Sequence, residues 1–291
     1  MQWFWAASRQ RNTWCAMLLA ACAAMGARSG DRLLASGGLM SIEGAAGGAL
    51  TPWAVIAGLG TDSEVGASGF CTEVKPQEFE LDSCGLAIGI DNRLELSLDR
   101  QRFDLSAVIP GQVIDQSVLG AKVRLYGDLV ADQDRPWPQV AVGAQWKDNT
   151  SFDLVPKALG ARHASGIDLY VAATKLWLDG PLGHSWIADL TLRYSEANQL
   201  GLLGFGGDIG SYHVLPEGSV GFFVTDHLVL GAEYRRKVDN LSACREDDFK
   251  DAFIAYLPAK WLTVSVAYAD LGNIADKPGQ AGPYISLQGS F

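Results

Sequence analysis

Apolar and polar residues alternate with a period of two along most of the chain. The clearest case is the stretch 93–99, where Leu94, Leu96 and Leu98 alternate with charged or small polar residues. Strict alternation sends apolar side chains to one face of a strand and polar side chains to the other. The same pattern predicts further strands at about 50–60, 64–73, 78–90, 93–103, 117–127, 137–147, 166–178, 184–196, 212–224, 227–236, 248–257, 260–270 and 282–291.

The last predicted strand ends the chain without a tail. Ile285, Leu287 and Phe291 share one parity, and Ser286 and Gln288 lie on the other. A strand that ends on an aromatic carboxy-terminus resembles the targeting signal of bacterial outer-membrane barrels, and we expect Phe291 to serve in this way. An exposed sheet edge is untenable in lipid, so a spanning strand of this kind needs a closed barrel.

The predicted strands have the length and connections of an outer-membrane barrel. Tilted strands of about 9–11 residues cross a bilayer. Tight connections (61–63, 91–92, 179–183, 225–226, 258–259) alternate with longer ones (104–116, 148–165, 197–211, 237–247, 271–281), apart from a long stretch at 128–136 and a short one at 74–77. Short turns face the periplasm and long loops face outward in such barrels. The sequence therefore predicts an all-β, transmembrane, antiparallel up-and-down β-barrel.

The direction of the last strand sets the expected number of strands. If it descends to the periplasm, the strand at 50–60 also descends, and another strand must rise before it. The stretch 33–43 is the candidate, followed by a glycine-rich connection at 44–48. This count predicts about fourteen strands, an even number as bacterial barrels have. Twelve is the alternative, because 33–43 and 50–60 are weakly patterned.

The first 27 residues have the pattern of a signal peptide. Arg9 and Arg11 precede a short apolar run at 14–24, and cleavage is expected after Gly26 or Ala27. Lipidation of Cys22 within a lipoprotein-like box is an alternative. Residues 28–291 then form a single barrel domain without an apolar run long enough for a spanning helix.

Composition bears on the partners of the chain. The 291 residues carry a formal net charge of −10, which argues against a nucleic-acid partner. We expect outer-membrane lipid, the barrel-assembly machinery and a small solute instead. Six tryptophans outside the leader fall near predicted strand ends, as in the aromatic girdles at membrane interfaces: Trp53, Trp137, Trp146, Trp177, Trp186 and Trp261.

Three segments resemble a known family. The stretches 42–53, 197–208 and 268–275 are similar to parts of a family of uncharacterised Gram-negative exported proteins, which is catalogued only as a domain of unknown function. The resemblance covers nearly all of the mature chain. It implies an exported, barrel-like protein and brings no catalytic residues.

Charged residues on the polar faces of the strands are the candidate functional residues. They are expected to line the lumen, where they either set solute preference or pair across strands: Arg93, Glu95, Asp99, Lys122, Arg124, Asp189, Arg193, Glu233 and Arg235. The glycine-rich stretch 201–210 is interpreted as a flexible external loop, because phosphate binding would need a following helix. Cys71 and Cys84 are roughly equidistant from the middle of the connection around Gln77, so they are either a cross-strand disulfide or two buried free thiols.

These observations favour a channel or porin-like protein for small solutes. A structural or surface-binding barrel with a plugged lumen is the alternative. A hydrolase at the outer rim, using His163 or His213 with Asp153, Ser165 or Ser211, is less favoured, and we expect no enzyme. The four histidines show no metal-ligand spacing, so neither a metal nor a cofactor is expected.

Overall fold

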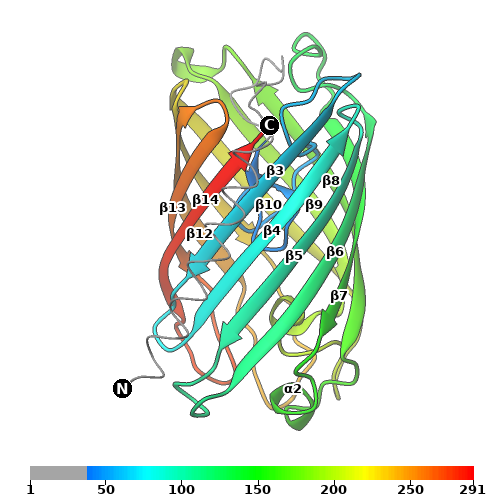
Figure 1. Cartoon of the computed structure of the whole chain (residues 1–291), viewed down its shortest axis with the longest axis vertical. Helices are drawn as coiled ribbons and strands as arrows, with labels where there is room; N and C mark the ends of the chain where they lie inside the picture. Colours follow the sequence, from blue (N-terminus) through cyan, green and yellow to red (C-terminus); the bar gives the residue numbers. More distant parts are fainter. Residues whose placement is uncertain (1–37) are drawn as a thin grey trace.

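The computed structural model describes residues 38–291, and the predicted leader with Cys22 lies outside them. Twelve antiparallel strands form a closed barrel, in which every neighbour in sequence is also a neighbour in space (Figure 1). The strands are β3 (Val65–Val74), β4 (Glu80–Ile90), β5 (Leu94–Asp104), β6 (Val113–Tyr126), β7 (Gln139–Asn149), β8 (Ser165–Trp177), β9 (Trp186–Ser195), β10 (His213–Thr225), β11 (Leu228–Arg235), β12 (Phe249–Ala259), β13 (Leu262–Asp270) and β14 (Ala281–Ser290).

Alternation of side chains decides which face of each strand is inside. In β5, Leu96 and Leu98 are exposed, whereas Glu95 and Asp99 are buried. Leucine outside and carboxylate inside is the reverse of a water-soluble sheet, and it suits a barrel surrounded by lipid. All the strands of the barrel were predicted, with bounds within a few residues of those observed.

The final strand closes the barrel against the first. β14 pairs with β3 from Tyr284↔Val74 to Ser290↔Ser68. The backbone amides of Leu59 and Ala67 donate to the carbonyl of Phe291 over 2.9 and 2.8 Å, which ties down the carboxy-terminus. The sheet therefore has no unpaired edge within the barrel.

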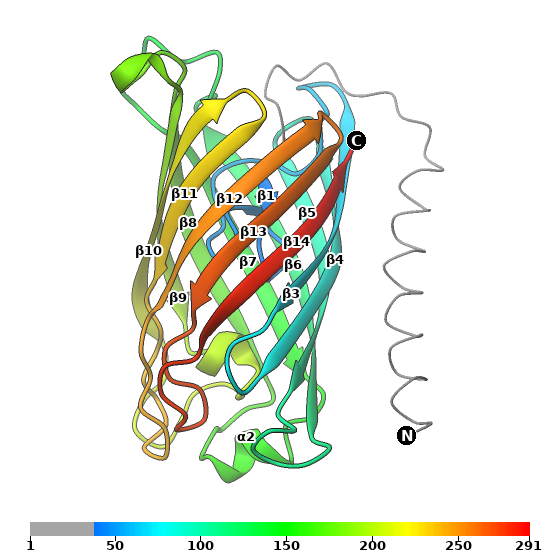
Figure 2. The ribbon, with the colours of Figure 1, turned by 90° about the vertical axis from the view of Figure 1, so that its left-hand side faces the viewer.

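The connections separate into two ends of the barrel. The carboxy-terminus lies at the end that carries the tight turns at 91–93, 226–227 and 260–261, and the helix α2 (Val155–Ala158) lies at the opposite end with the long loops (Figures 1 and 2). The two exceptions noted in the sequence persist, at 127–138 and 75–79. Two short 3-10 turns, η1 (Pro181–Gly183) and η2 (Asn198–Gly201), complete the described elements, none of which is a helix long and apolar enough to cross a membrane.

Residues 38–60 lie inside the barrel and are called the plug here (Figure 2). Every residue from Leu39 to Gly60 is buried, and the only strands in this segment are the short pair β1 (Leu39–Met40) and β2 (Ala46–Gly47). The expected strands at 50–60 and 33–43 are therefore not part of the barrel, although residues 33–37 lie outside the described range. The barrel has twelve strands, the alternative count, and not fourteen.

The predicted number of strands is too high because the plug is buried on all sides. A segment that is buried everywhere has no solvent or lipid face to impose alternation. Its small residues also permit close contact with other backbone. A Cβ atom on Gly47 would lie 2.4 Å from the carbonyl oxygen of Thr51, so only glycine fits there.

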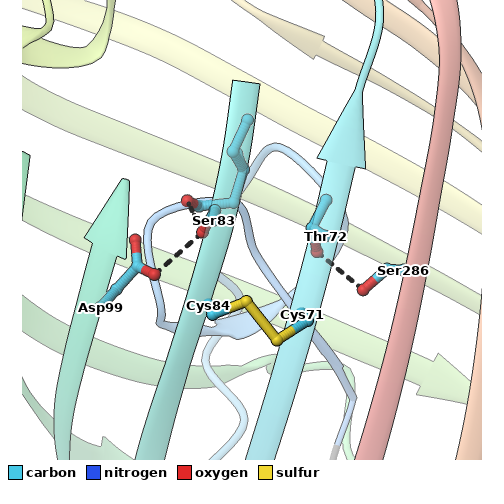
Figure 3. The surroundings of a disulfide bond; sticks show 7 residues. Cys71, Thr72, Ser83, Cys84, Asp99 and Ser286 are labelled. Carbon is cyan, nitrogen blue, oxygen red and sulfur yellow. Dashed lines mark hydrogen bonds between the residues drawn. A yellow bond between two sulfur atoms is a disulfide. The ribbon is translucent and has the colours of Figure 1, made fainter. Parts of the chain in front are cut away.

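Cys71 and Cys84 lie directly opposite each other in β3 and β4 and form a disulfide (Figure 3). Their neighbours Thr72 and Ser83 are buried and face the lumen, where Thr72 bonds Ser286 and Ser83 bonds Asp99. Because side chains alternate, the disulfide faces outward, toward lipid.

We expect this disulfide to add about 3 kcal/mol to the unfolding free energy, since it closes a loop of 13 residues in the unfolded chain. A reductant should lower the urea midpoint of the wild type in detergent and leave the double variant C71S/C84S unchanged. C244S, which removes the buried free thiol, should respond to the reductant like the wild type. Equal midpoints for oxidised and reduced wild type would contradict the prediction.

Candidate functional site: the filled lumen

The barrel wall turns a set of polar and charged side chains toward the plug. Seven of the nine charged residues predicted to line the lumen are buried there, each at most 7% exposed: Glu95, Asp99, Lys122, Asp189, Arg193, Glu233 and Arg235. They contact protein and not a water-filled passage. This position follows from the inward parity of their strands.

The other two predicted lumen residues, Arg93 and Arg124, lie at the short-turn rim. Arg93 is exposed in the turn between β4 and β5, because the strand begins only at Leu94. Arg124 is near the end of β6, and its guanidinium binds Asp62 over 3.1 Å and Asp128 over 2.8 Å. Together they line a shallow pocket of about 250 Å³ outside the lumen.

The one charged residue of the plug, Glu43, sits among three cations of the wall. Its carboxylate contacts the Nζ of Lys147, and it accepts from Arg235 over 2.5 Å and faces Arg193 at 3.6 Å. These three come from β7, β11 and β9 respectively. Each of the four side chains is at most 5% exposed, so the ion pairs are shielded from solvent.

Two further wall carboxylates complete this network. Asp168 lies 2.6 Å from Lys147 and 3.3 Å from Arg193, and Glu217 lies 2.5 Å from Arg193 and 3.3 Å from Arg235. Lys147, Asp168 and Glu217 were not among the predicted site residues, although their parity on predicted strands would have identified them. No such signal exists for Glu43, which lies in a segment without regular alternation.

A second contact holds the main chain of the plug. The carboxylate of Glu95 accepts from the amides of Ala46 and Ala57 over 3.2 and 2.9 Å. Lys122 pairs with Glu95 at 3.1 Å and donates to the carbonyl of Ala46. The wall therefore supplies to the plug the hydrogen bonds that a neighbouring strand would otherwise provide.

Glutamine and threonine side chains continue this pattern around the barrel. Gln139 donates to the carbonyl of Ala54 over 2.5 Å, and the amide of Ala54 donates to Thr174 over 2.7 Å. On the other side, Gln288 of the closing strand accepts from the amide of Met40 over 2.8 Å. Polar groups buried with partners cost little, so the plug is accommodated in a polar wall.

The loop between β9 and β10 closes the lumen at the long-loop end. Residues 195–207 are all buried, with Leu202, Leu203 and Phe205 at most 1% exposed. Asn149 of β7 donates to the carbonyl of Leu202 over 2.8 Å. The stretch 201–210 was expected to be a flexible external loop, and this is wrong for 201–207, which fold inward. Glycines permit this path: Gly201 and Gly204 have φ of +97° and +79°.

The three segments that carry the family resemblance meet at this loop. Ile42 and Leu50 of the plug, Leu202 and Leu203 of the inward loop, and Ile274 after β13 belong to one cluster of buried apolar side chains. The resemblance segments are thus the parts that fill and cover the lumen.

A buried ion pair stabilises the loops that cover this end. Lys237 and Glu246 contact each other at 2.5 Å, and their side chains are 4% and 2% exposed. Lys237 also donates to the carbonyls of Leu271 and Asn273, so one ammonium joins two neighbouring loops. Burial raises the pKa of Glu246 to about 6 and lowers that of Lys237.

The six tryptophans that were predicted to form the aromatic girdles lie in two different environments. Trp137, Trp146, Trp177 and Trp261 are 41% to 65% exposed, and Trp186 is half-buried beside Phe222 on the outer face. Trp53 is 5% exposed inside the lumen and is not a girdle residue. It follows Pro52 in the plug, so its position in the fold has no relation to a strand end.

Two of the residues considered for a rim hydrolase have other side-chain partners. His213 bonds the side chain of Asn240 at 3.1 Å, and Asp153 pairs with Lys157. His163 bonds the backbone of Phe205 through its own amide and carbonyl. Within residues 38–291, neither histidine ring has a hydrogen bond to Ser165 or Ser211.

Comparison with solved structures finds outer-membrane barrels. The KdgM porin in complex with disordered oligogalacturonate is 11% identical with a TM-score of 0.51, covering 77% of this chain and 99% of the porin. The NanC porin is 10% identical with a TM-score of 0.47, covering 78% and 99%. Outer membrane phospholipase A from Escherichia coli is 10% identical with a TM-score of 0.39, covering 78% and 91%. At such identities the likeness shows the fold alone.

A closed barrel whose outward leucines contact lipid places the protein in the bacterial outer membrane. A search of curated proteins finds no match. The model of a protein family of unknown function, DUF3034, matches residues 36–288. The chain therefore belongs to the DUF3034 family of proteins of unknown function.

Proposed function

We propose that this protein is a porin-like channel that is closed at rest by its own plug and passes small solutes only when the plug leaves the lumen. The observation that carries the proposal is the complete burial of residues 39–60 inside a ring of twelve strands. Barrels of about eight strands are filled by side chains of the wall, and wider ones enclose space. Here a separate segment fills that space.

The polar and charged contacts between the wall and the plug favour a plug that can leave the lumen. Glu95, Gln139 and Thr174 bind the main chain of the plug through polar groups, and Lys147, Arg193 and Arg235 bind Glu43 by charge. Water can replace each of these contacts, because charged and amide groups are well solvated. A wall of this chemistry would line an aqueous passage once the plug had moved.

Conductance of the wild type in planar bilayers tests the proposal. We expect a silent protein in buffer and stepwise conductance when urea is added, at a concentration below that which abolishes heat-modifiable migration of the barrel on a gel. The plug should leave first, since it contributes no strand to the closed ring. Open channels in untreated protein would contradict a closed resting state.

A permanently plugged barrel that presents its outer loops is the second candidate. It is favoured by the apolar cluster that joins Ile42 and Leu50 of the plug to Leu202 and Leu203 of the inward loop, because apolar contacts are not replaced by water. Silence at every urea concentration up to unfolding of the barrel would support this candidate against the channel.

The barrel-assembly machinery is the proposed partner during biogenesis. The proposal is supported by the closing strand, which alternates Tyr284, Ser286 and Gln288 inward with Ile285 and Leu287 outward and ends on Phe291. The solute remains a small molecule of unspecified class, because the wall carries charges of both signs.

A further inference from the structure

Four carboxylates in the interior have no basic partner. The strands and the plug together bury eight carboxylates and four basic side chains. The basic ones, Lys122, Lys147, Arg193 and Arg235, pair with Glu95, Glu43, Asp168 and Glu217. Asp99, Asp189, Glu233 and Asp251 form no ion pair within the described chain. A buried carboxylate without a counter-charge must take up a proton or bind a cation.

Three of these four lie in one row across adjacent strands. Asp189 of β9 is opposite Ser219 of β10, Ser219 is opposite Glu233 of β11, and Glu233 is opposite Asp251 of β12. Directly opposed residues have Cβ atoms about 4.5–5.5 Å apart. Asp189, Ser219, Glu233 and Asp251 are all buried on the lumen side. The carboxylates of Glu233 and Asp251 are thus close neighbours.

An independent observation comes from polar atoms that lack partners. The hydroxyl of Ser219, in a residue 8% exposed, has no hydrogen-bond partner among the described residues. The carboxyl group of Asp251, which is 7% exposed, has no partner other than Glu233 among the described residues. Such groups in a folded protein call for a bound water or ion. Ser219 and Asp251 flank Glu233 on either side.

The nearest cation on the same strand does not neutralise this row. Arg235 lies two residues after Glu233 on β11, and its guanidinium is directed to Glu43 and Glu217. Asp189, at the edge of the row, accepts hydrogen bonds from Thr174 and Thr191 and has no basic partner among the described residues.

The plug covers the row from the lumen side. Glu233 accepts from the amide of Leu50 over 2.7 Å and from the hydroxyl of Thr51 over 2.8 Å. A Cβ atom on Gly48 would lie 1.8 Å from Oε1 of Glu233, so the main chain of the plug approaches the carboxylate closely. A ligand at Glu233 would be enclosed between the wall and the plug.

We propose that Ser219, Glu233 and Asp251 form a binding site for one hard cation of the calcium class. Carboxylate and hydroxyl oxygens are the ligands that Ca²⁺ takes, and two carboxylates balance its charge. The bound cation removes the repulsion between Glu233 and Asp251 and so stabilises the carboxylate that holds Leu50 and Thr51. The site goes beyond the proposed channel function, since binding is measured on the closed protein whether or not the lumen ever opens.

Calorimetric titration of the full chain in detergent, after treatment with EDTA, tests the site. We expect one Ca²⁺ per barrel, and binding weakened about tenfold or more in D251N and E233Q, which remove a ligand charge. S219A should weaken binding by a smaller factor while leaving all charges in place. D99N is the matched control, because Asp99 is also buried without a basic partner but lies outside the row. The Ca²⁺ affinity of D99N should equal that of the wild type.

Two other results would overturn the proposal. If the pair shares a proton instead, the wild type will bind no Ca²⁺, and its unfolding temperature will change with pH but not with Ca²⁺. If Ca²⁺ binds the outward cluster of Glu73, Glu80 and Asp82, then E80Q will weaken binding and D251N will not. Heat-modifiable migration identifies any variant that fails to fold. If D251N or E233Q fails to fold, the Ca²⁺ affinity of S219A tests the site instead.

Discussion

Deletion of residues 38–60 is expected to convert a barrel without measurable conductance into an open channel. The plug contributes no strand to the ring, in which each of the twelve strands is paired on both sides, so the barrel should close without it. Its removal also takes Ile42 and Leu50 from the apolar cluster that holds the inward loop at 195–207. Water should then enter a lumen lined by Lys147, Arg193 and Arg235.

Single-channel recording in planar bilayers measures this effect. The deletion variant should give stepwise conductance above the background of an empty membrane, and the wild type should give none. Deletion of 106–111, an exposed part of the loop between β5 and β6, is the control and should stay silent. A deletion variant that migrates as a folded barrel and remains silent would show that the inward loop alone shuts the lumen.

Replacement of Glu43 by Gln is expected to destabilise the closed state by about 3–5 kcal/mol. The change leaves Lys147, Arg193 and Arg235 with one carboxylate fewer, and breaking a buried ion pair by removing one partner costs energy in this range. All three cations are buried, so water cannot screen them while the plug is in place. Once the plug leaves, the same cations can be hydrated, and the closed state loses its advantage.

The urea concentration at which conductance begins reports this loss. It should be much lower for E43Q than for the wild type, whereas the concentration that unfolds the barrel should change less. E43D keeps the charge and should lie closer to the wild type, and E78Q, which alters an exposed carboxylate in the loop between β3 and β4, should not differ from it. Equal opening concentrations for E43Q and the wild type would exclude Glu43 as the anchor of the plug.

The alternation of side chains predicted the barrel because two solvents impose it. Lipid outside requires residues such as Leu96 and Leu98, and the polar interior accepts Glu95 and Asp99. Each constraint acts on every second residue, so a strand can be identified from its own sequence. The same parity placed Arg193 and Glu233 inside, and it would have placed Lys147 and Glu217 there as well.

The plug escaped prediction because its environment is made by distant residues. Met40 is bound by Gln288, Glu43 by Arg235, and Ala54 by Gln139. These partners lie 248, 192 and 85 residues away in the chain. Nothing local distinguishes such a segment from a weak strand, which is why the pattern predicts strands at 33–43 and 50–60 and a girdle position for Trp53.

The alternation in the sequence is enough to predict the barrel class and to place all twelve strands among fourteen candidates, since lipid and lumen act on neighbouring residues directly. Only the tertiary structure decided that the lumen is filled, that Glu43 meets three cations and that Glu233 lies beside Asp251. Those features depend on closure of the ring and on strand register, which bring together charges from separate strands and from the amino-terminal segment.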